Sequence, residues 1–133
     1  MTETLLRLFD TTALIDIYRG KPWLRQRFLS VVSGELEAYI SVLTVAELWR
    51  GVQSTELERH EAVLSYFGSL TLEAATARLA GAWMGRYGVQ GLGWMDALIT
   101  ATAYRAGLTI LTRDSRLAHL LAGEASFELY TPG

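Results

Sequence analysis

Four acidic residues stand at positions where together they could build a metal site. Asp10 directly follows a short apolar run at residues 5–9, and Asp114 follows another at residues 108–112. Glu47 and Asp96 fall in the first turns of predicted helices. In a parallel sheet with helical crossovers, strand ends and helix starts share one edge, so we expect all four carboxylates to converge there.

Carboxylates gathered at one edge repel one another unless something compensates their charge. Two charges about 4 Å apart repel by about 4 kcal/mol at an effective dielectric of about 20. The cluster must therefore be protonated or hold a cation. Oxygen ligands favour Mg²⁺, with Mn²⁺ as an alternative, because these ions bind through a few carboxylates and keep waters for substrate phosphates. Each acid taken alone is more readily explained as a helix cap, so the prediction depends on their joint placement.

The elements that must position these acids alternate along the chain. The apolar pattern predicts strands at about residues 5–9, 38–43, 108–112 and 127–130, with a short extended piece at 70–72. Thr11 or Thr12 is expected to cap the first helix, and Thr44 with Glu47 fits a capping box. Further helices are predicted to start near Pro22, Ser54, Glu73, Asp96 and Asp114. Strands separated by helices indicate an α/β fold with a mostly parallel sheet.

Composition narrows the class of protein. The 133 residues, half of them hydrophobic, fit a single domain over residues 1–133. The absence of cysteine excludes disulfides and thiolate metal sites and favours a reducing, cytoplasmic location. The first ten residues lack the basic region of a signal peptide, and no apolar run approaches the roughly 20 residues of a membrane span. The net charge of −2 counts against a simple nucleic-acid-binding module.

Three ordered motifs carry a family resemblance that covers nearly the whole chain. They are FDTTALIDIYRG, SVLTVAELWRG and MDALITATAYRAGLTILTRD. They resemble the successive motifs of the PIN-domain nucleases, and are most like those of the VapC-type toxins of bacterial toxin–antitoxin pairs. The resemblance implies a three-layer α/β/α fold and a Mg²⁺-dependent endoribonuclease activity. It also implies an acidic quartet that corresponds to Asp10, Glu47, Asp96 and Asp114.

The resemblance has further implications for the pocket and for partners. Thr11 and Thr112 match small hydroxyl positions that line the pocket, whereas Met95 stands where many family members carry a polar residue. RNA is the implied substrate, and the implied protein partners are a second copy of the chain and a small antitoxin. Such an antitoxin wraps the toxin and places a basic side chain among the acids. The predicted helices at 23–32 and 63–67 also carry enough large apolar side chains to indicate a shared surface.

Several neighbouring residues keep more than one interpretation. Arg113 either pairs with the acids or approaches a phosphate. Asp16 is better explained as an ion-pair partner than as a metal ligand. His60 and His119 lie far from any metal-ligand spacing, so we expect surface or hydrogen-bonded positions. The tryptophans expected to pack in the core, with an interface as the second choice, are Trp49, Trp83 and Trp94.

Other functional classes fit the sequence less well. A receiver-like phosphoacceptor module would also bind Mg²⁺ at this edge, but it needs a lysine near its last strands and the only lysine is Lys21. A phosphatase with two aspartates two residues apart is disfavoured because Thr12 occupies the second position. A PIN-like module that binds RNA without cutting it is a third alternative. The presence of all four expected acids favours activity over that alternative.

Overall fold

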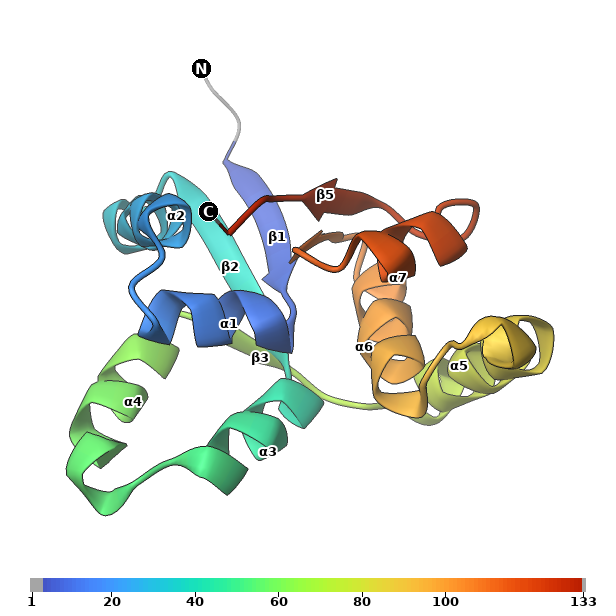
Figure 1. Cartoon of the computed structure of the whole chain (residues 1–133), viewed down its shortest axis with the longest axis horizontal. Helices are drawn as coiled ribbons and strands as arrows, with labels where there is room; N and C mark the ends of the chain where they lie inside the picture. Colours follow the sequence, from blue (N-terminus) through green and yellow to red (C-terminus); the bar gives the residue numbers. More distant parts are fainter. Residues whose placement is uncertain (1–3, 133) are drawn as a thin grey trace.

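The computed structural model of the chain describes residues 4–132, and in them a five-stranded sheet forms the centre (Figure 1). Its strand order is β3-β2-β1-β4-β5, and all four neighbouring pairs are parallel. The prediction of a mostly parallel sheet is therefore confirmed. The strands are β1 (Leu5–Phe9), β2 (Leu36–Ser41), β3 (Gly68–Leu70), β4 (Thr109–Thr112) and β5 (Phe127–Leu129).

Helices connect these strands, as the alternating pattern predicts. The helices of the described chain are α1 (Thr11–Tyr18), α2 (Pro22–Ser33), α3 (Val42–Gly51), α4 (Leu57–Leu64), α5 (Ala74–Tyr87), α6 (Trp94–Arg105) and α7 (Ser115–Leu120), with 3-10 turns at Ser54–Glu56 and Gly88–Gln90. Gly34 ends α2 in the left-handed region at φ 85°, where a residue without a side chain fits best. None of the helices in residues 4–132 has both the length and the hydropathy needed to cross a bilayer.

Alternate residues of the strands divide the core into two layers, one on each face of the sheet. In β1, Phe9 packs with α1, α2 and α4, whereas Leu8 packs with α6. A further cluster around the buried Trp83 packs α5 against α6 and α7. Helices thus cover both faces, and the predicted three-layer α/β/α fold is confirmed.

The first half of β1 is less buried than the second half. Leu8 and Phe9 are fully buried, but Leu5 and Leu6 are exposed. The reason is sheet geometry, because β2 pairs with β1 from Leu5 onward whereas the pairing with β4 begins only at Arg7. The predicted strand at residues 5–9 is therefore present, but its first two apolar residues are exposed.

Two helices begin at residues other than those predicted. Ser41 caps α3, and its hydroxyl accepts a hydrogen bond of 3.1 Å from the backbone nitrogen of Leu43. The predicted capping box of Thr44 and Glu47 is therefore wrong, and Glu47 lies in the second turn of α3. Asp10 itself, and neither of the following threonines, caps α1. Both differences arise because serine and aspartate at a strand end are good N-caps.

The tryptophans and the outer helices show how much apolar surface stays uncovered. Trp83 is buried as predicted, but Trp94 is 56% exposed because it lies at the first position of α6, outside the packed layers. Trp49 is also exposed on one side. On α2, Leu29 and Val32 are exposed, so the apolar surface expected there is present. The homodimer that could cover it stays a prediction.

Candidate active site

The strand order places Asp10 and Asp114 at the point where the chain reverses its direction across the sheet. β2 and β3 lie on one side of β1, and β4 and β5 lie on the other. In open α/β sheets, ligands bind at such a switch point, beyond the carboxyl ends of the strands. The backbone nitrogen of Asp10 donates to the carbonyl of Leu111 at 3.2 Å, which joins the ends of β1 and β4. The two aspartates therefore leave the sheet at the same edge.

Asp10 is a buried carboxylate held by neutral donors. Its side chain is 7% exposed, and its Oδ1 accepts hydrogen bonds from the Thr12 hydroxyl at 2.7 Å and the Ala13 backbone nitrogen at 2.9 Å. Burial is the main cause that raises the pKa of Asp10, although hydrogen bonds from Thr112, Thr12 and Ala13 act in the opposite direction. The negative charge of Asp114 raises the pKa of Asp10 further. The charged form of Asp10 thus lacks a compensating cation.

Thr112 connects Asp10 with Asp114. The fully buried Thr112 hydroxyl accepts a hydrogen bond of 3.0 Å from the backbone nitrogen of Asp114 and also hydrogen-bonds the Asp10 side chain. Asp114 in turn caps α7, where its Oδ1 accepts from the backbone nitrogen of Leu117 at 3.0 Å. The last residue of β4 therefore fixes the position of two acids from two different elements.

Glu47 reaches the same edge from α3, where Thr11 holds it. The Thr11 hydroxyl donates to Oε1 of Glu47 at 2.6 Å and lies 3.0 Å from the hydroxyl of the buried Thr44. Because Thr11 is the first residue of α1, this contact joins the start of α1 to α3. Glu47 itself is exposed, next to the half-buried Thr11.

Asp96 completes the group from the first turn of α6. Partial burial is the largest cause that raises the pKa of the Asp96 carboxyl. The negative charges of the other three acids raise the pKa further, in the order Asp114, Asp10 and Glu47. Asp96 and Asp114 also line a common recess of about 40 Å³, together with Arg116. The structure thus brings the four predicted acids within range of mutual repulsion.

The four carboxylates carry no cation of their own. Among residues 4–132, none of the four forms a salt bridge. The same residues contain no group of three or more Asp, Glu or His side chains arranged to hold a metal ion as they stand. Asp10, Asp114 and Glu47 instead each accept a hydrogen bond from a donor near a helix start. A set of oxygen ligands that repel one another and lack a positive partner has the chemistry that suits Mg²⁺.

Arg113 lies next to the acids in sequence but pairs elsewhere. Its Nε lies 3.5 Å from Oδ2 of Asp16, a fully buried residue of α1. The prediction that Asp16 is an ion-pair partner is confirmed. The hydroxyl of Tyr130 donates to the same Oδ2 at 2.7 Å. The sequence did not reveal this third residue, because no local pattern links two side chains 114 positions apart.

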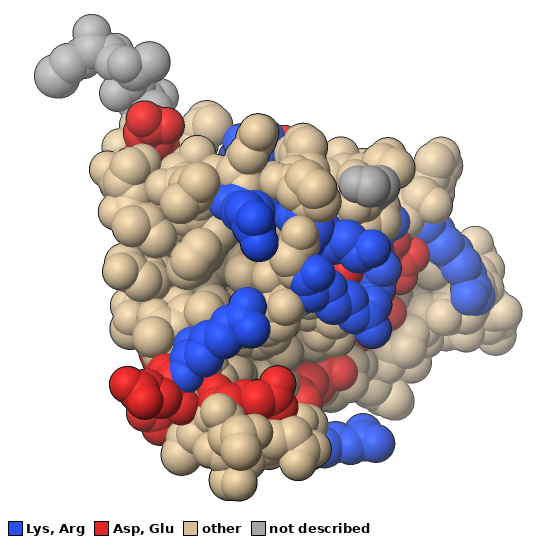
Figure 2. Space-filling model, turned by 60° about the vertical axis from the view of Figure 1, so that its left-hand side comes forward, with Lys and Arg blue, Asp and Glu red and all other residues tan. Residues whose placement is uncertain are grey.

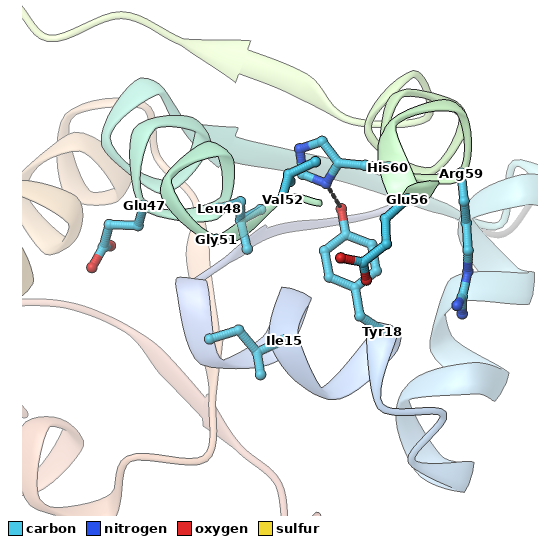
Figure 3. A pocket seen from close by; sticks show the side chains of 9 residues that line it. All are labelled: Ile15, Tyr18, Glu47, Leu48, Gly51, Val52, Glu56, Arg59 and His60. Atoms are coloured by element: carbon cyan, nitrogen blue, oxygen red, sulfur yellow. Dashed lines mark hydrogen bonds between the residues drawn. The ribbon is translucent and has the colours of Figure 1, made fainter. Parts of the chain in front are cut away.

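A pocket of about 260 Å³ lies beside the acids, between α1, α3 and α4 (Figure 3). Tyr18 points from α1 toward His60 on α4, whereas Glu47 lies at the other end of the pocket and points away from His60. The Tyr18 hydroxyl lies 2.8 Å from Nδ1 of the buried His60. Burial raises the pKa of Tyr18 to about 12, so the hydroxyl stays protonated, and the tautomer of His60 sets which of the two groups donates. Burial also lowers the pKa of His60, which favours a neutral ring.

The histidines otherwise lie as predicted. His60 is hydrogen-bonded at Nδ1, although its Nε2 is buried without a hydrogen-bond partner among the described residues. His119 is exposed on α7. Neither histidine lines the recess that Asp96 and Asp114 share.

Comparison with known proteins agrees with this geometry. Residues 7–121 match the PIN domain family. Ribonuclease VapC19 from Mycobacterium tuberculosis is 31% identical over 113 residues, which cover 84% of this chain and 90% of the relative. A chain of a toxin–antitoxin complex from Klebsiella pneumoniae aligns with a TM-score of 0.74 at 27% identity, over 96% of this chain and 98% of that chain. A chain of DNA-bound VapBC from Salmonella typhimurium shares the fold, with a TM-score of 0.79 at 23% identity over 96% and 100% of the two chains. The chain therefore belongs to the PIN-domain family, and within it to the VapC type.

Proposed function

We propose that the chain is a Mg²⁺-dependent endoribonuclease and the toxin of a toxin–antitoxin pair. The observation that carries this proposal is the group of four carboxylates at the switch point of the sheet, which no cation of the described chain neutralises. Its relative VapC19, which is named a ribonuclease, supports the choice of RNA as the substrate.

The acids and their neighbours have distinct parts in this proposal. Asp10 and Asp96 would hold the ion directly, and Glu47 and Asp114 would complete its shell through waters or a second ion. Bound Mg²⁺ supplies positive charge beside a phosphodiester and lowers the pKa of an attacking water, and Mn²⁺ can take its place. Thr112 keeps Asp10 and Asp114 together.

Local positive charge would bind the RNA backbone despite the net charge of −2. Figure 2 shows Lys and Arg side chains gathered on the face that carries α2 and α4, above a group of acidic side chains. The segment at residues 17–34 contains no acid and four cationic residues, namely Arg19, Lys21, Arg25 and Arg27. At the acid edge itself, Arg116 shares the recess of Asp96 and Asp114.

We propose a cognate antitoxin and a second copy of the chain as partners. The similar chain from Klebsiella pneumoniae belongs to a toxin–antitoxin complex, which supports the antitoxin. The acid edge is a suitable site for an arginine of that partner, which would displace Mg²⁺. The exposed Leu29 and Val32 on α2 supply apolar surface for an interface.

The activity can be tested on purified protein with RNA and Mg²⁺, with and without EDTA. We expect cleavage that EDTA abolishes and that leaves 5′-phosphate ends, because water is the attacking group. Asp96→Asn is the matched control, since it removes one charge and keeps the shape. Cleavage that persists in EDTA would overturn the metal mechanism. RNA that is bound in Mg²⁺ or Mn²⁺ but never cut would instead favour the RNA-binding module.

The toxin role needs a separate experiment in cells. Expression of the chain alone should arrest growth, whereas Asp96→Asn should be harmless at the same protein level. Coexpression of the product of a neighbouring short gene should restore growth. Harmless expression of a protein that is active in vitro would leave the nuclease proposal standing and remove the toxin role.

A further inference from the structure

We propose that Asp16 and Tyr130 are positioning residues that hold Arg113 away from the four acids and keep it available for a phosphate of the RNA. This inference rests on the proposed ribonuclease function and concerns residues outside the acidic quartet. It starts from the unusual surroundings of one buried carboxylate.

Asp16 is a charge inside the protein with few partners. It is fully buried on α1, where its Oδ2 accepts a hydrogen bond of 2.7 Å from the Tyr130 hydroxyl and lies 3.5 Å from Nε of Arg113. Its Oδ1 is buried with no hydrogen-bond partner in the described chain. A buried charge with such incomplete compensation is costly, so simple packing gives no reason for an aspartate here.

Tyr130 connects this carboxylate to the end of β4. The backbone nitrogen of Tyr130 donates to the carbonyl of Thr112 at 3.1 Å, and the Tyr130 ring stacks on Trp23 of α2 with 5.1 Å between ring centroids. Thr112 directly precedes Arg113. The Tyr130 hydroxyl is therefore held in place. It in turn holds the carboxylate of Asp16, which pairs with Arg113.

Arg113 has strong competing partners close by. It precedes Asp114 in sequence and follows the residue that hydrogen-bonds Asp10. An arginine released at this edge would be attracted to the four carboxylates and would occupy the place of a metal ion. In the structure Arg113 pairs with Asp16, and none of the four acids forms a salt bridge within the described residues. The salt bridge with Asp16 thus keeps the acids free.

The held arginine retains groups for a substrate. Within the described chain, Arg113 forms a single salt bridge, through Nε, and its side chain is about one-third exposed. The terminal nitrogens are left for another partner. A guanidinium binds phosphate through parallel hydrogen bonds, which also fixes the orientation of the phosphate. Arg113 at the edge of the site could therefore orient the backbone of the RNA beside the acids.

Four variants separate this role from a purely structural one: Arg113→Gln, Asp16→Asn, Tyr130→Phe and the double variant Asp16→Asn/Arg113→Gln. Mg²⁺ affinity is measured by calorimetry without RNA, and KM and kcat are measured with RNA at several salt concentrations. Arg86→Gln is the control for loss of one arginine. Arg86 is an exposed residue of α5 that also forms a salt bridge, with Glu124.

Each variant has a distinct expected result. Arg113→Gln should raise KM about tenfold, as loss of one charge-assisted hydrogen bond does, with little change in kcat or Mg²⁺ affinity. It should also reduce the salt dependence of RNA binding by about 0.7 in the log–log slope. Asp16→Asn should weaken Mg²⁺ binding, because the freed Arg113 competes for the acids. The double variant should recover Mg²⁺ affinity, and Tyr130→Phe should show the Asp16→Asn effect in weaker form.

The outcomes that overturn the inference differ from those that overturn the nuclease. If the wild type cleaves RNA but Arg113→Gln keeps its KM and salt dependence, Arg113 does not bind a phosphate. If Asp16→Asn weakens Mg²⁺ binding and the double variant weakens it further, Asp16 has a structural role only. Absence of cleavage by the wild type would overturn the proposed function. The Mg²⁺ measurements would still test whether Asp16 restrains Arg113.

Discussion

Asp10 and Asp16 are two buried aspartates on the same short helix, and they differ in what surrounds them. Asp10 caps α1 and accepts hydrogen bonds from a hydroxyl and from backbone, with no cation within reach in the described chain. Asp16 lies six residues further on, and it meets the guanidinium of Arg113 and the hydroxyl of Tyr130. Asp10 thus lacks a positive partner, whereas Asp16 has one.

The difference shows how to recognise a binding site among buried acids. A buried carboxylate that pairs with a cation of the protein loses that attraction when it is neutralised. One that is left with neutral donors and other acids is relieved by a proton or by a cation from outside. Asp96 is more exposed than Asp10, but it also forms no salt bridge, and the negative charges of Asp114, Asp10 and Glu47 raise its pKa. Substitutions at Asp10 and at Asp16 should therefore change stability in opposite directions.

The largest effect is expected for Asp10→Asn. The change keeps the size of the side chain and its ability to cap α1, but it removes a charge from the proposed ion shell. We expect RNA cleavage to fall by at least about 100-fold and Mg²⁺ to bind more weakly. The metal-free protein should become more stable, because repulsion and a desolvated charge are removed. Single-turnover cleavage and thermal unfolding in EDTA measure the two effects. A less stable variant that still cleaves RNA would mean that Asp10 only caps the helix.

Asp16→Asn is the same substitution at the aspartate that has a positive partner. It leaves Arg113 without its partner, so the free energy of unfolding should fall by about 2–3 kcal/mol, less than for a fully buried pair because Arg113 is partly exposed. Urea unfolding in EDTA provides the measurement. A gain in stability, as expected for Asp10→Asn, would show that the two sites do not differ as their surroundings indicate.

A smaller effect is expected in how the stability of the metal-free protein depends on pH, because the pKa is raised at Asp10 and Asp96. The raised pKa values of Asp10 and Asp96 mean that the folded protein binds more protons than the unfolded chain just above the ordinary aspartate pKa. Stability of the metal-free protein should therefore fall as the pH rises from about 4 through the raised values. Melting temperatures between pH 4 and 8 in EDTA test this trend. Added Mg²⁺ should reverse the loss, and Asp10→Asn/Asp96→Asn should flatten the dependence.

The smallest effect is expected in the neighbouring pocket. Tyr18→Phe removes the hydroxyl that is hydrogen-bonded to Nδ1 of His60 and should cost about 1 kcal/mol of unfolding free energy. Cleavage should not change, because this pair lies apart from the four acids. Urea unfolding and cleavage assays on the same preparation measure both. A clear loss of activity would extend the functional site from Glu47 into the pocket.

The parallel sheet and the acids at its edge could be predicted from the sequence. An apolar run of strand length precedes Asp10, and another precedes Arg113 and Asp114, and both runs are local signals. Because parallel strands end at one edge of a sheet, the two acids are expected to lie together. Local signals did not identify the N-cap of a helix where two residues were equally suitable as caps. Ser41 and Thr44 are both good N-caps, and in the structure Ser41, the last residue of β2, starts α3.

Which charges are compensated and which apolar side chains stay exposed depends on contacts between distant parts of the chain. The contact of Asp16 with Tyr130 spans 114 positions, and the burial of His60 depends on Tyr18 from another helix. Trp94 is as apolar as Trp83, yet one is exposed and the other is buried. Periodicity and capping are properties of neighbouring residues, whereas the partner of a side chain in space depends on how whole elements pack.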